Sequence, residues 1–302
     1  MIACFESSTD TLSFVSRTYD TVSFLSDLGY ESEHVGVVKA VLRESAPQVV
    51  VIDLTHGIAP FDTRGASLSL ARAVPYLTEG IVIAAVDPGA SSERRLVAVE
   101  VAGGAGIFIG PDNGLLAPGV ALAGGAERAV VLDRDELHLA TPGTTFVARD
   151  VFAPIAALLA NGADLFDVGT EIDPSLLLPG IVPIPREEDG GFACEVLWVD
   201  RFGNCQLNVS LDDLENSWVN PVQRVRVSFG DTTRNFVVAQ SYAELGQGAA
   251  GLVIDSGGLL CVAVDSGSAA EQLRLGEGQQ VTLQPGGDEP AVVTPVSLRP
   301  SH

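Results

Sequence analysis

The sequence has few residues of the kinds that build metal centres and disulfide frameworks. Its 302 residues include four cysteines and four histidines. The cysteines are scattered, without a Cys-x-x-Cys pair, and the histidines show neither His-x-x-His nor His-Glu-x-x-His spacing. Zinc sites use ligands at such short spacings, and disulfide-stapled domains use dense cysteines. The sequence therefore predicts no metal site and no disulfide scaffold.

Basic residues are also scarce. Lys and Arg number 17 against 39 Asp and Glu, which gives a formal net charge of −22. Because nucleic acids are bound through cations that neutralise phosphates, this charge argues against a nucleic-acid partner. The charge suits a cationic ligand, although an acidic surface that keeps a protein soluble is the more common explanation.

Long apolar runs and a targeting segment are missing too. No run reaches the roughly 18–20 apolar residues that a membrane span requires. The opening MIACFESSTD carries two acids and no basic cluster, unlike a signal peptide. With 46% hydrophobic and 19% charged residues, the composition is that of a globular chain. We therefore expect a cytoplasmic protein with no membrane partner.

Several common catalytic motifs do not occur. The sequence has neither a Gly-x-Ser-x-Gly nucleophile elbow nor a Gly-x-x-x-x-Gly-Lys-Ser/Thr phosphate loop. The glycine cluster at 103–106 lacks dinucleotide-binding spacing and lies between two strand-like runs. We interpret it as a hairpin turn.

The first half of the chain alternates strand-like runs with helical patterns. Apolar runs at 22–27, 48–53 and 81–87 are separated by helical patterns, which predicts right-handed crossovers and a mostly parallel sheet. The runs LVAVEV and GIFIG indicate an added hairpin or edge strands. Ser32 and Asp150 are candidate helix caps, and Gly162 is a candidate helix stop.

The second half has a different pattern. Short strand-like runs separated by glycine-rich turns replace the helical periodicity, which predicts a small all-β domain, barrel-like in form. A proline-rich segment with a charged, glycine-ended tail joins the halves and is typical of a linker. We therefore divide the chain into an extension of unknown role, an α/β domain, a linker and a β domain, at residues 1–17, 18–178, 179–191 and 192–302.

Three predicted strands end in an aspartate: Asp27, Asp53 and Asp87. Ligands of open parallel sheets bind outside the carboxyl ends of the strands, so position makes these acids candidates. The alternative is that each caps a turn or helix. Asp53 favours that alternative, because Thr55 and His56 follow it in a pattern typical of a tight loop. Asp87 favours a site, because the turn after it leads to Arg94 and Arg95.

Eight segments resemble one family. SDLG at 26–29, with Lys39 twelve residues after Asp27, is similar to the opening motif of the S-adenosyl-L-methionine (SAM) hydroxide adenosyltransferases, which are relatives of fluorinase and chlorinase. The similarity continues in order through DLTHGIAPFD, AVPYLTEG, VDPGASSERR, GPDNGLL, TTFVARDVFAP, VDRFGNCQLNV and DSGGLLCVAVDSGSAAE. One such segment is weak evidence, but eight in register are strong. The resemblance implies an enzyme without a cofactor that attacks C5′ of its substrate SAM with water and releases adenosine and methionine.

The resemblance also implies a binding site. Asp27 would hold the ribose hydroxyls, and Phe61 would form an aromatic wall beside the ribose. Asp200 would bind the methionine ammonium through a charge-assisted hydrogen bond. Phe202 would stack on the adenine and Asn204 would hydrogen-bond its edge. From the residues alone, Phe202 is equally a core residue and Asn204 a turn residue.

Further contacts and an assembly follow from the same resemblance. Tyr242 would cover the opposite face of the adenine and Ser256 would contact the methionine end. The backbone near Val264 and Ser266 would contact the adenine. The family forms homotrimers in which each site lies between the α/β domain of one subunit and the β domain of its neighbour. That arrangement would explain why ligand motifs occur in both halves of this chain.

The chemistry implied by the family uses an Asp–Arg–His set. Asp87 and Arg94 match the first two, and we expect them to position the nucleophilic water and assist loss of its proton. At the histidine position this chain has Val147, which has no polar atom. His34 or His56 could approach this position in space. Asp87 and Arg94 could suffice, the pocket could be shifted, or the protein could bind SAM without turnover.

A SAM-dependent halogenase is the remaining alternative. The fluorinase and chlorinase pattern has a neutral residue at the aspartate position and tyrosine at the histidine position, whereas this chain keeps Asp87. An ionised carboxylate beside a halide repels it by about 4 kcal/mol at 4 Å, if the effective dielectric constant is about 20. The sequence therefore favours water over halide as the nucleophile.

Overall fold

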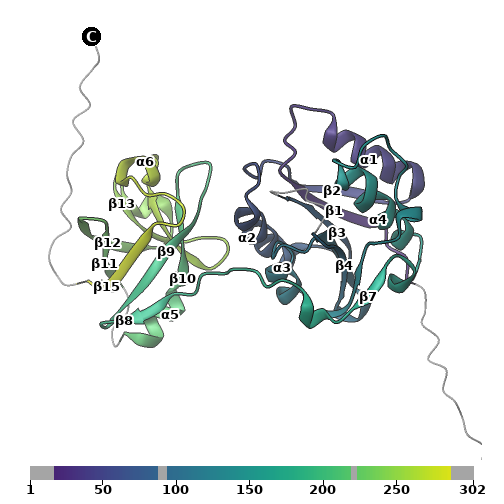
Figure 1. Cartoon of the computed structure of the whole chain (residues 1–302). Helices are drawn as coiled ribbons and strands as arrows, with labels where there is room; N and C mark the ends of the chain where they lie inside the picture. Colours follow the sequence, from purple (N-terminus) through teal and green to yellow (C-terminus); the bar gives the residue numbers. More distant parts are fainter. Residues whose placement is uncertain (1–16, 88–93, 219–222, 287–302) are drawn as a thin grey trace, which may run out of the picture. The chain divides into compact units, whose positions relative to one another are not determined.

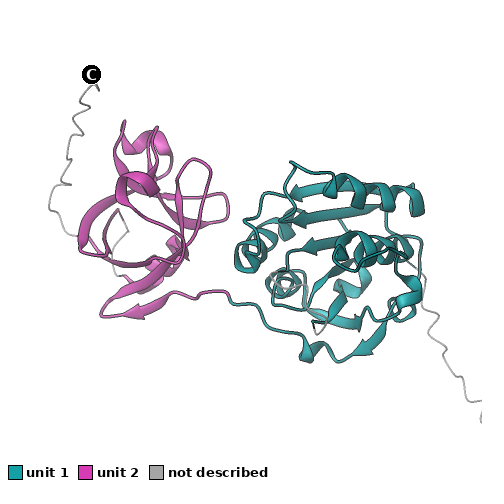
Figure 2. Ribbon diagram, turned by 45° about the horizontal axis from the view of Figure 1, so that its top comes forward, with its two compact units in different colours: residues 1–181 teal, residues 182–302 magenta. Residues whose placement is uncertain are grey.

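The computed structural model describes residues 17–87, 94–218 and 223–286. The chain divides into two compact units, residues 1–181 and 182–302 (Figure 2). The predicted extension, 1–17, falls almost wholly outside the described residues. No helix in the described ranges combines the length and apolar character needed to cross a membrane.

Within the described residues of the first unit, seven strands form one sheet in the order β2-β1-β3-β5-β4-β6-β7. The neighbours from β2 to β5 in this order are parallel, whereas β4 runs antiparallel between β5 and β6, and β7 runs antiparallel to β6. The predicted mostly parallel sheet is confirmed. The strands are β1 (Thr21–Ser26), β2 (Val50–Thr55), β3 (Gly80–Ala85), β4 (Leu96–Val101), β5 (Gly106–Pro111), β6 (Ala126–Val131) and β7 (Thr170–Ile172).

The predicted hairpin is β4 and β5, joined by a turn over Ala102–Gly104. It does not form the edge of the sheet, because β6 and β7 extend the sheet beyond β4. The glycine cluster therefore has the turn role that its position indicates.

Helices cover both faces of this sheet (Figure 1). The helix α1 (His34–Ser45) packs against α4 (Ala153–Ala160), and α2 (Thr63–Ala73) packs against α3 (Ala117–Leu122). The first pair buries Leu42 and Leu159 against Phe24 of β1, whereas α2 buries Leu70 in a second cluster with Leu25. Alternate residues of β1 thus enter different cores, which explains why its apolar run is nearly continuous.

The two predicted helix caps are wrong. The N-cap residue of α1 is Glu33, and the Ser32 hydroxyl instead lies 2.6 Å from Nδ1 of His34. Asp150 lies inside a π-helical turn, Ala148–Phe152, where Arg149 and Thr141 bind its carboxylate. The helix stop at Gly162 is confirmed by its positive φ of 94° just after α4.

The second unit is a closed β-barrel with one appended strand. In its described residues the order is β10-β14-β13-β12-β11-β15-β9, and a further pairing of β9 with β10 closes the ring. The short strand β8 (Arg186–Glu188) pairs with β9 and falls within the expected linker, 179–191. The barrel strands are β9 (Gly191–Val199), β10 (Cys205–Ser210), β11 (Arg224–Phe229), β12 (Thr232–Ala239), β13 (Ala250–Ile254), β14 (Leu259–Val264) and β15 (Gln280–Pro285).

The predicted barrel-like domain is confirmed, but its helices were missed. The helices α5 (Leu211–Ser217) and α6 (Ala269–Leu273) are each under eight residues, too short for a helical apolar period to be seen. The core of the barrel includes Val196, Leu207, Val227, Leu252 and Val262. Remaining 3₁₀ turns occupy Val74–Tyr76, Asp135–Leu137, Leu165–Asp167, Pro174–Leu176 and Tyr242–Leu245.

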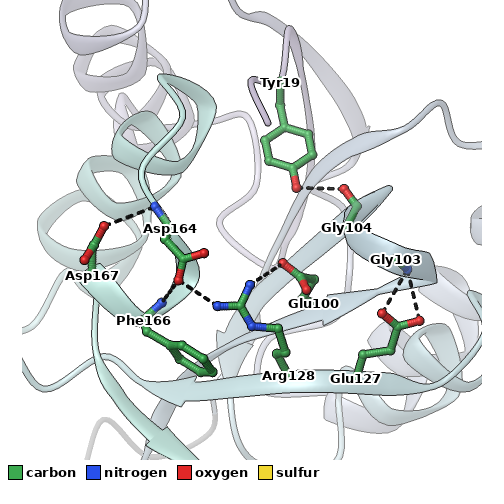
Figure 3. A network of polar contacts seen from close by, with 9 residues as sticks. All are labelled: Tyr19, Glu100, Gly103, Gly104, Glu127, Arg128, Asp164, Phe166 and Asp167. Carbon is green, nitrogen blue, oxygen red and sulfur yellow. Dashed lines mark hydrogen bonds and ion pairs between the residues drawn. The ribbon is translucent and has the colours of Figure 1, made fainter. Parts of the chain in front are cut away.

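A polar network ties together elements at the amino ends of the parallel strands (Figure 3). Arg128 of β6 donates hydrogen bonds to Glu100 of β4 and to Asp164, and its guanidinium lies 4.0 Å from the centre of the Phe166 ring. Burial alone would raise the pKa of Asp164, but hydrogen bonds from Arg128 and the Phe166 N–H lower it. Because the charged groups of this network are hydrogen-bonded to one another, we interpret the network as structural.

Candidate active site

The carboxyl ends of β1 and β3 bring two of the predicted site residues together. The two strands are parallel neighbours, and Ser26 pairs with Ala85. Asp27 follows β1 directly and Asp87 lies two residues beyond β3. Both side chains line one cavity of ≈ 130 Å³. The cavity therefore lies where ligands of parallel sheets bind.

Asp87 is paired with the arginine that the sequence proposes as its partner. The Arg94 guanidinium forms an ion pair with the Asp87 carboxylate, and both side chains are mostly buried. The turn that separates them, 88–93, lies outside the described residues. The structure thus brings an acid of the cavity and a cation together across this turn.

Asp27 is held by the segment that carries Phe61. The backbone N–H of Phe61 donates a hydrogen bond of 2.8 Å to Oδ2 of Asp27. Phe61 adopts a φ of 68°, a conformation that bulky side chains rarely adopt, and its side chain is 64% exposed. The backbone of Phe61, a residue expected at the ribose, therefore contacts the carboxylate that is expected there too.

The wall of the cavity beyond the two acids is largely apolar. Val147 lies there with Phe146, Ala148 and Phe152, and it packs against the core beneath. Thr145, Leu96 and Pro111 also contribute, although the sequence analysis did not single them out. Thr145 and Pro111 belong to the motif segments TTFVARDVFAP and GPDNGLL, which is the signal that could have found them, whereas Leu96 lies just outside the motif VDPGASSERR.

Neither candidate histidine replaces the missing one at the cavity. The described lining residues include neither His34 nor His56. The His34 ring packs edge-on against Phe146, with ring centres 4.9 Å apart. His56 is completely buried. The expectation that His34 or His56 approaches the position of the family histidine is not supported by this arrangement.

Asp53 does not share the cavity. It lies within β2, where Lys39 Nζ is 2.9 Å from its Oδ2. Burial would raise the pKa of Asp53, but its interactions with Lys39 and His56 outweigh burial and lower it. Lys39, the lysine of the opening motif, thus forms an ion pair with Asp53, which agrees with a structural role for Asp53.

In the barrel unit, Asp200 organises the turn between β9 and β10. Its Oδ1 accepts hydrogen bonds from the backbone N–H groups of Phe202 and Asn204, and its Oδ2 accepts one from the Asn204 side chain, all at 2.8 Å. Gly203 has a φ of 82° and lies against Ser268, leaving no room for a side chain. The turn buries Asn204 and leaves Phe202 76% exposed.

The other predicted barrel residues lie around this turn and along β14. Burial, the Cys261 side chain and the carboxylates of Asp200 and Asp255 raise the pKa of the Tyr242 phenol. Val264 ends β14 and Ser266, with a φ of 58°, follows it. Ser256 lies in the turn before β14, at the opposite end of that strand. The structure groups Tyr242 with Asp200 but separates Ser256 from Val264 and Ser266.

A larger cavity in the first unit is a weaker candidate. It measures ≈ 230 Å³ and its lining is mainly apolar, including Val97, Leu116 and Leu177. Its acid, Asp112, accepts hydrogen bonds from Arg95 at 2.5 Å and from the Leu178 N–H at 2.8 Å. Among the residues described, no group of three His, Cys, Asp or Glu side chains is placed to hold a metal ion.

The fold and the site define a class of protein: an α/β unit with acids at the carboxyl ends of its parallel strands, followed by a small β-barrel unit. Residues 22–169 match the family model described as the SAM hydroxide adenosyltransferase N-terminal domain, and residues 194–282 match that of the C-terminal domain. The chain belongs to the SAM hydroxide adenosyltransferase family, as the sequence motifs predict.

Relatives of known name agree with this assignment. A Salinispora tropica protein named (R)-S-adenosyl-L-methionine hydrolase is 39% identical over 266 residues, 88% of this chain and 98% of that protein. A Thermus thermophilus protein of the same name is 40% identical over 270 residues, 87% of this chain and 98% of that protein. A fluorinase from an Actinoplanes species is 26% identical over 288 residues, 87% of this chain and 96% of that protein.

A solved structure shares the fold. The crystal structure of an uncharacterized conserved protein from Thermotoga maritima matches with a TM-score of 0.80 at 32% identity. The match covers 87% of this chain and 99% of that chain. The similarity therefore extends over both units.

Proposed function

We propose that this protein hydrolyses SAM at C5′ and releases adenosine and L-methionine. The water oxygen forms a bond to C5′ while the C5′–S bond breaks, and its electron pair stays on sulfur, giving a neutral thioether. The proton of the water passes to a base or to solvent. A sulfonium leaves without general acid catalysis, so the protein must orient the water, exclude other solvent and assist proton loss.

The observation that supports this proposal most directly is the position of the Asp87 side chain in the cavity. Its carboxylate lines the cavity at the strand ends and pairs with Arg94, whereas Val147 and its neighbours supply apolar walls. Asp87 accepts the proton and counters the sulfonium charge, and Arg94 orients the water. With Val147 at the third position, these two side chains carry the chemistry without a histidine.

Substrate contacts are proposed for the remaining site residues. Asp27 accepts hydrogen bonds from the ribose hydroxyls, since one carboxylate offers about four lone-pair sites and the Phe61 N–H occupies one. The Asp200 carboxylate accepts three hydrogen bonds within its own turn, and it binds the methionine ammonium through its remaining lone pair. The exposed rings of Phe61, Phe202 and Tyr242 provide stacking surfaces that a nucleoside would cover.

Contacts at the two ends of β14 complete the proposed site. Ser256 contacts the methionine end of SAM, whereas the backbone of Val264 and Ser266 contacts the adenine. No cofactor takes part, because SAM is the substrate.

Product analysis tests this function. Purified protein is incubated with each sulfonium epimer of SAM, with and without chloride or fluoride, and the products are separated by chromatography. Hydrolysis predicts adenosine and methionine at a rate independent of halide. A 5′-halo-adenosine would show a halogenase, and SAM retained but unchanged would show a binding protein.

We further propose that the protein is a homotrimer whose sites lie between subunits. The cavity of ≈ 130 Å³ is smaller than the roughly 300–1,000 Å³ typical of small-molecule sites. Residues expected to bind the rest of SAM belong to the other compact unit. A neighbouring subunit would supply them in the proposed assembly.

Complementation between inactive variants tests the shared site, and light scattering gives the subunit number. Asp87→Asn and Asp200→Asn chains are co-expressed with different tags. If sites form between subunits, some sites receive a wild-type residue from each chain, and about a quarter of the wild-type rate returns in random mixtures. Activity that stays absent would place each site within one chain. The cytoplasmic location remains a prediction, which cell fractionation would test.

A further inference from the structure

His56 is a buried titratable residue that the proposed reaction does not use. Its side chain has no exposed surface, and its ring lies edge-on to Phe24 and Tyr30. Nδ1 lies 2.7 Å from the hydroxyl of Ser26, itself fully buried, and Nε2 lies 3.3 Å from Oδ1 of Asp53. The ring therefore joins the end of β1 to β2.

The surrounding groups favour one direction for the contacts. The Asp53 carboxylate, which accepts from Lys39, lies 3.3 Å from Nε2 as a charge contact without hydrogen-bond geometry, and an acceptor on that side favours the tautomer with the ring hydrogen on Nε2. Nδ1 is then an acceptor and the Ser26 hydroxyl donates to it. The same hydroxyl oxygen accepts the Leu28 N–H at 3.3 Å. The two contacts of the hydroxyl are therefore compatible.

These contacts hold both ends of the SDLG loop. Ser26 begins the loop and is fixed by the ring, whereas the backbone N–H of Gly29 donates to the carbonyl oxygen of His56 at 2.9 Å. Gly29 has a φ of 69°, which suits glycine. Asp27 lies between the two fixed points and lines the cavity. One residue, directly after the neighbouring strand β2, thus contacts both ends of the loop.

We infer that His56, acting through Ser26, is a positioning residue that orients the Asp27 carboxylate for the nucleoside. This inference rests on the proposed function, in which Asp27 binds the ribose hydroxyls. His56 itself touches no substrate. Its effect is on binding, because a misdirected Asp27 weakens hydrogen bonds made in both the ground state and the transition state.

Three variants separate the two contacts of the ring. Ser26→Ala removes the hydroxyl. His56→Asn places an amide oxygen near the position of Nδ1, so it keeps an acceptor for Ser26, whereas His56→Gln reaches towards Asp53 and loses that acceptor. The dissociation constant of adenosine is measured by calorimetry, and KM and kcat are measured with SAM.

The expected result is a split between binding and turnover. Ser26→Ala and His56→Gln raise KM and the adenosine dissociation constant about tenfold, as expected for one lost hydrogen bond, and leave kcat nearly unchanged. His56→Asn restores most of the binding. In an Asp27→Ala background, Ser26→Ala causes no further loss, because its effect passes through Asp27.

A merely structural role gives different outcomes. If Ser26→Ala weakened binding equally with and without Asp27, or left binding unchanged, the inference would be wrong. Ile155→Val, a core change in α4, is the control for lost stability alone. If the wild type bound adenosine but did not cleave SAM, the proposed hydrolysis would fail, and the adenosine binding of the same variants would still decide the role of His56.

Discussion

The backbone N–H of Phe61 donates a hydrogen bond of 2.8 Å to the Asp27 carboxylate. To make it, Phe61 adopts a φ of 68°, in the left-handed region that costs a residue with a side chain of order 1 kcal/mol. The ring of Phe61 is exposed rather than buried in a core. An unfavourable backbone conformation that holds a carboxylate at a cavity is typical of a ligand site.

The first prediction separates the ring of Phe61 from its backbone. Phe61→Gly keeps the N–H donor and removes the left-handed penalty, so the midpoint of thermal unfolding should not fall. KM for SAM should rise about tenfold, since stacking on an aromatic ring is lost. Phe61→Leu is the control for stability, because it also removes the aromatic ring but keeps the left-handed backbone penalty. A fall in stability with unchanged KM would show that the ring is structural.

Asp87 is predicted to act in the chemical step. Asp87→Asn keeps the size of the side chain but removes the base, so kcat should fall by about 10²–10⁴-fold. Asp135→Asn changes an acid whose side chain is fully exposed, and it should leave kcat unchanged. An Asp87→Asn enzyme as fast as the wild type would remove Asp87 from the mechanism.

Val147 gives a prediction of gained activity. It lines the cavity with Asp87 where relatives with the Asp–Arg–His set are expected to have histidine. Val147→His supplies a second polar group beside the water and should raise kcat about tenfold, through general base catalysis. Val147→Met fills similar space without a base and should not. Equal rates for both variants would mean that water at this cavity needs no further base.

The network around Arg128 predicts how stability depends on pH. The pKa of Asp164 is lowered in the folded protein, so its contribution to the free energy of unfolding is present above the ordinary pKa of 3.8 and is lost as pH falls through the folded value. Asp164→Asn keeps a cap for the Phe166 N–H but loses the charge. Because the Asp164 side chain is 41% exposed, the variant should be less stable by only about 1 kcal/mol at neutral pH.

Denaturant unfolding at several pH values checks this dependence. The difference between wild type and Asp164→Asn should shrink as the pH falls below 3.8, where Asp164 of the unfolded chain becomes protonated, and should be lost below the lowered pKa of the folded state. A difference that is constant over this range would show that the ion pair with Arg128 contributes nothing through charge.

Much of the fold could be predicted from the sequence, because strands with buried faces have apolar patterns. The run that forms β1 is an example, since all but its first residue are buried. The strand β10 has no simple apolar pattern, because Gln206 and Asn208 are polar yet buried. Their partners, the Asp255 carboxylate and the Glu195 N–H, are distant in sequence. No local pattern predicts such contacts.

The candidate site could be predicted only in part. Motif segments gave Asp27 and Asp87, and strand order brings them together. Lys39 lies beside Asp53, and His56 contacts Ser26, only because β2 lies next to β1 in the sheet. Spacing along the chain does not reveal these contacts. The cap predicted at Asp150 failed because a π-helical turn starts two residues earlier.

The most direct test of the central claim, that water attacks C5′ of SAM, is to run the reaction in water labelled with oxygen-18. Mass spectrometry of the adenosine should show the label in the 5′-hydroxyl, with no label in methionine, and Asp87→Asn should slow its formation by about 10²–10⁴-fold. Unlabelled adenosine, or a labelled product formed at the same rate by Asp87→Asn, would contradict the mechanism.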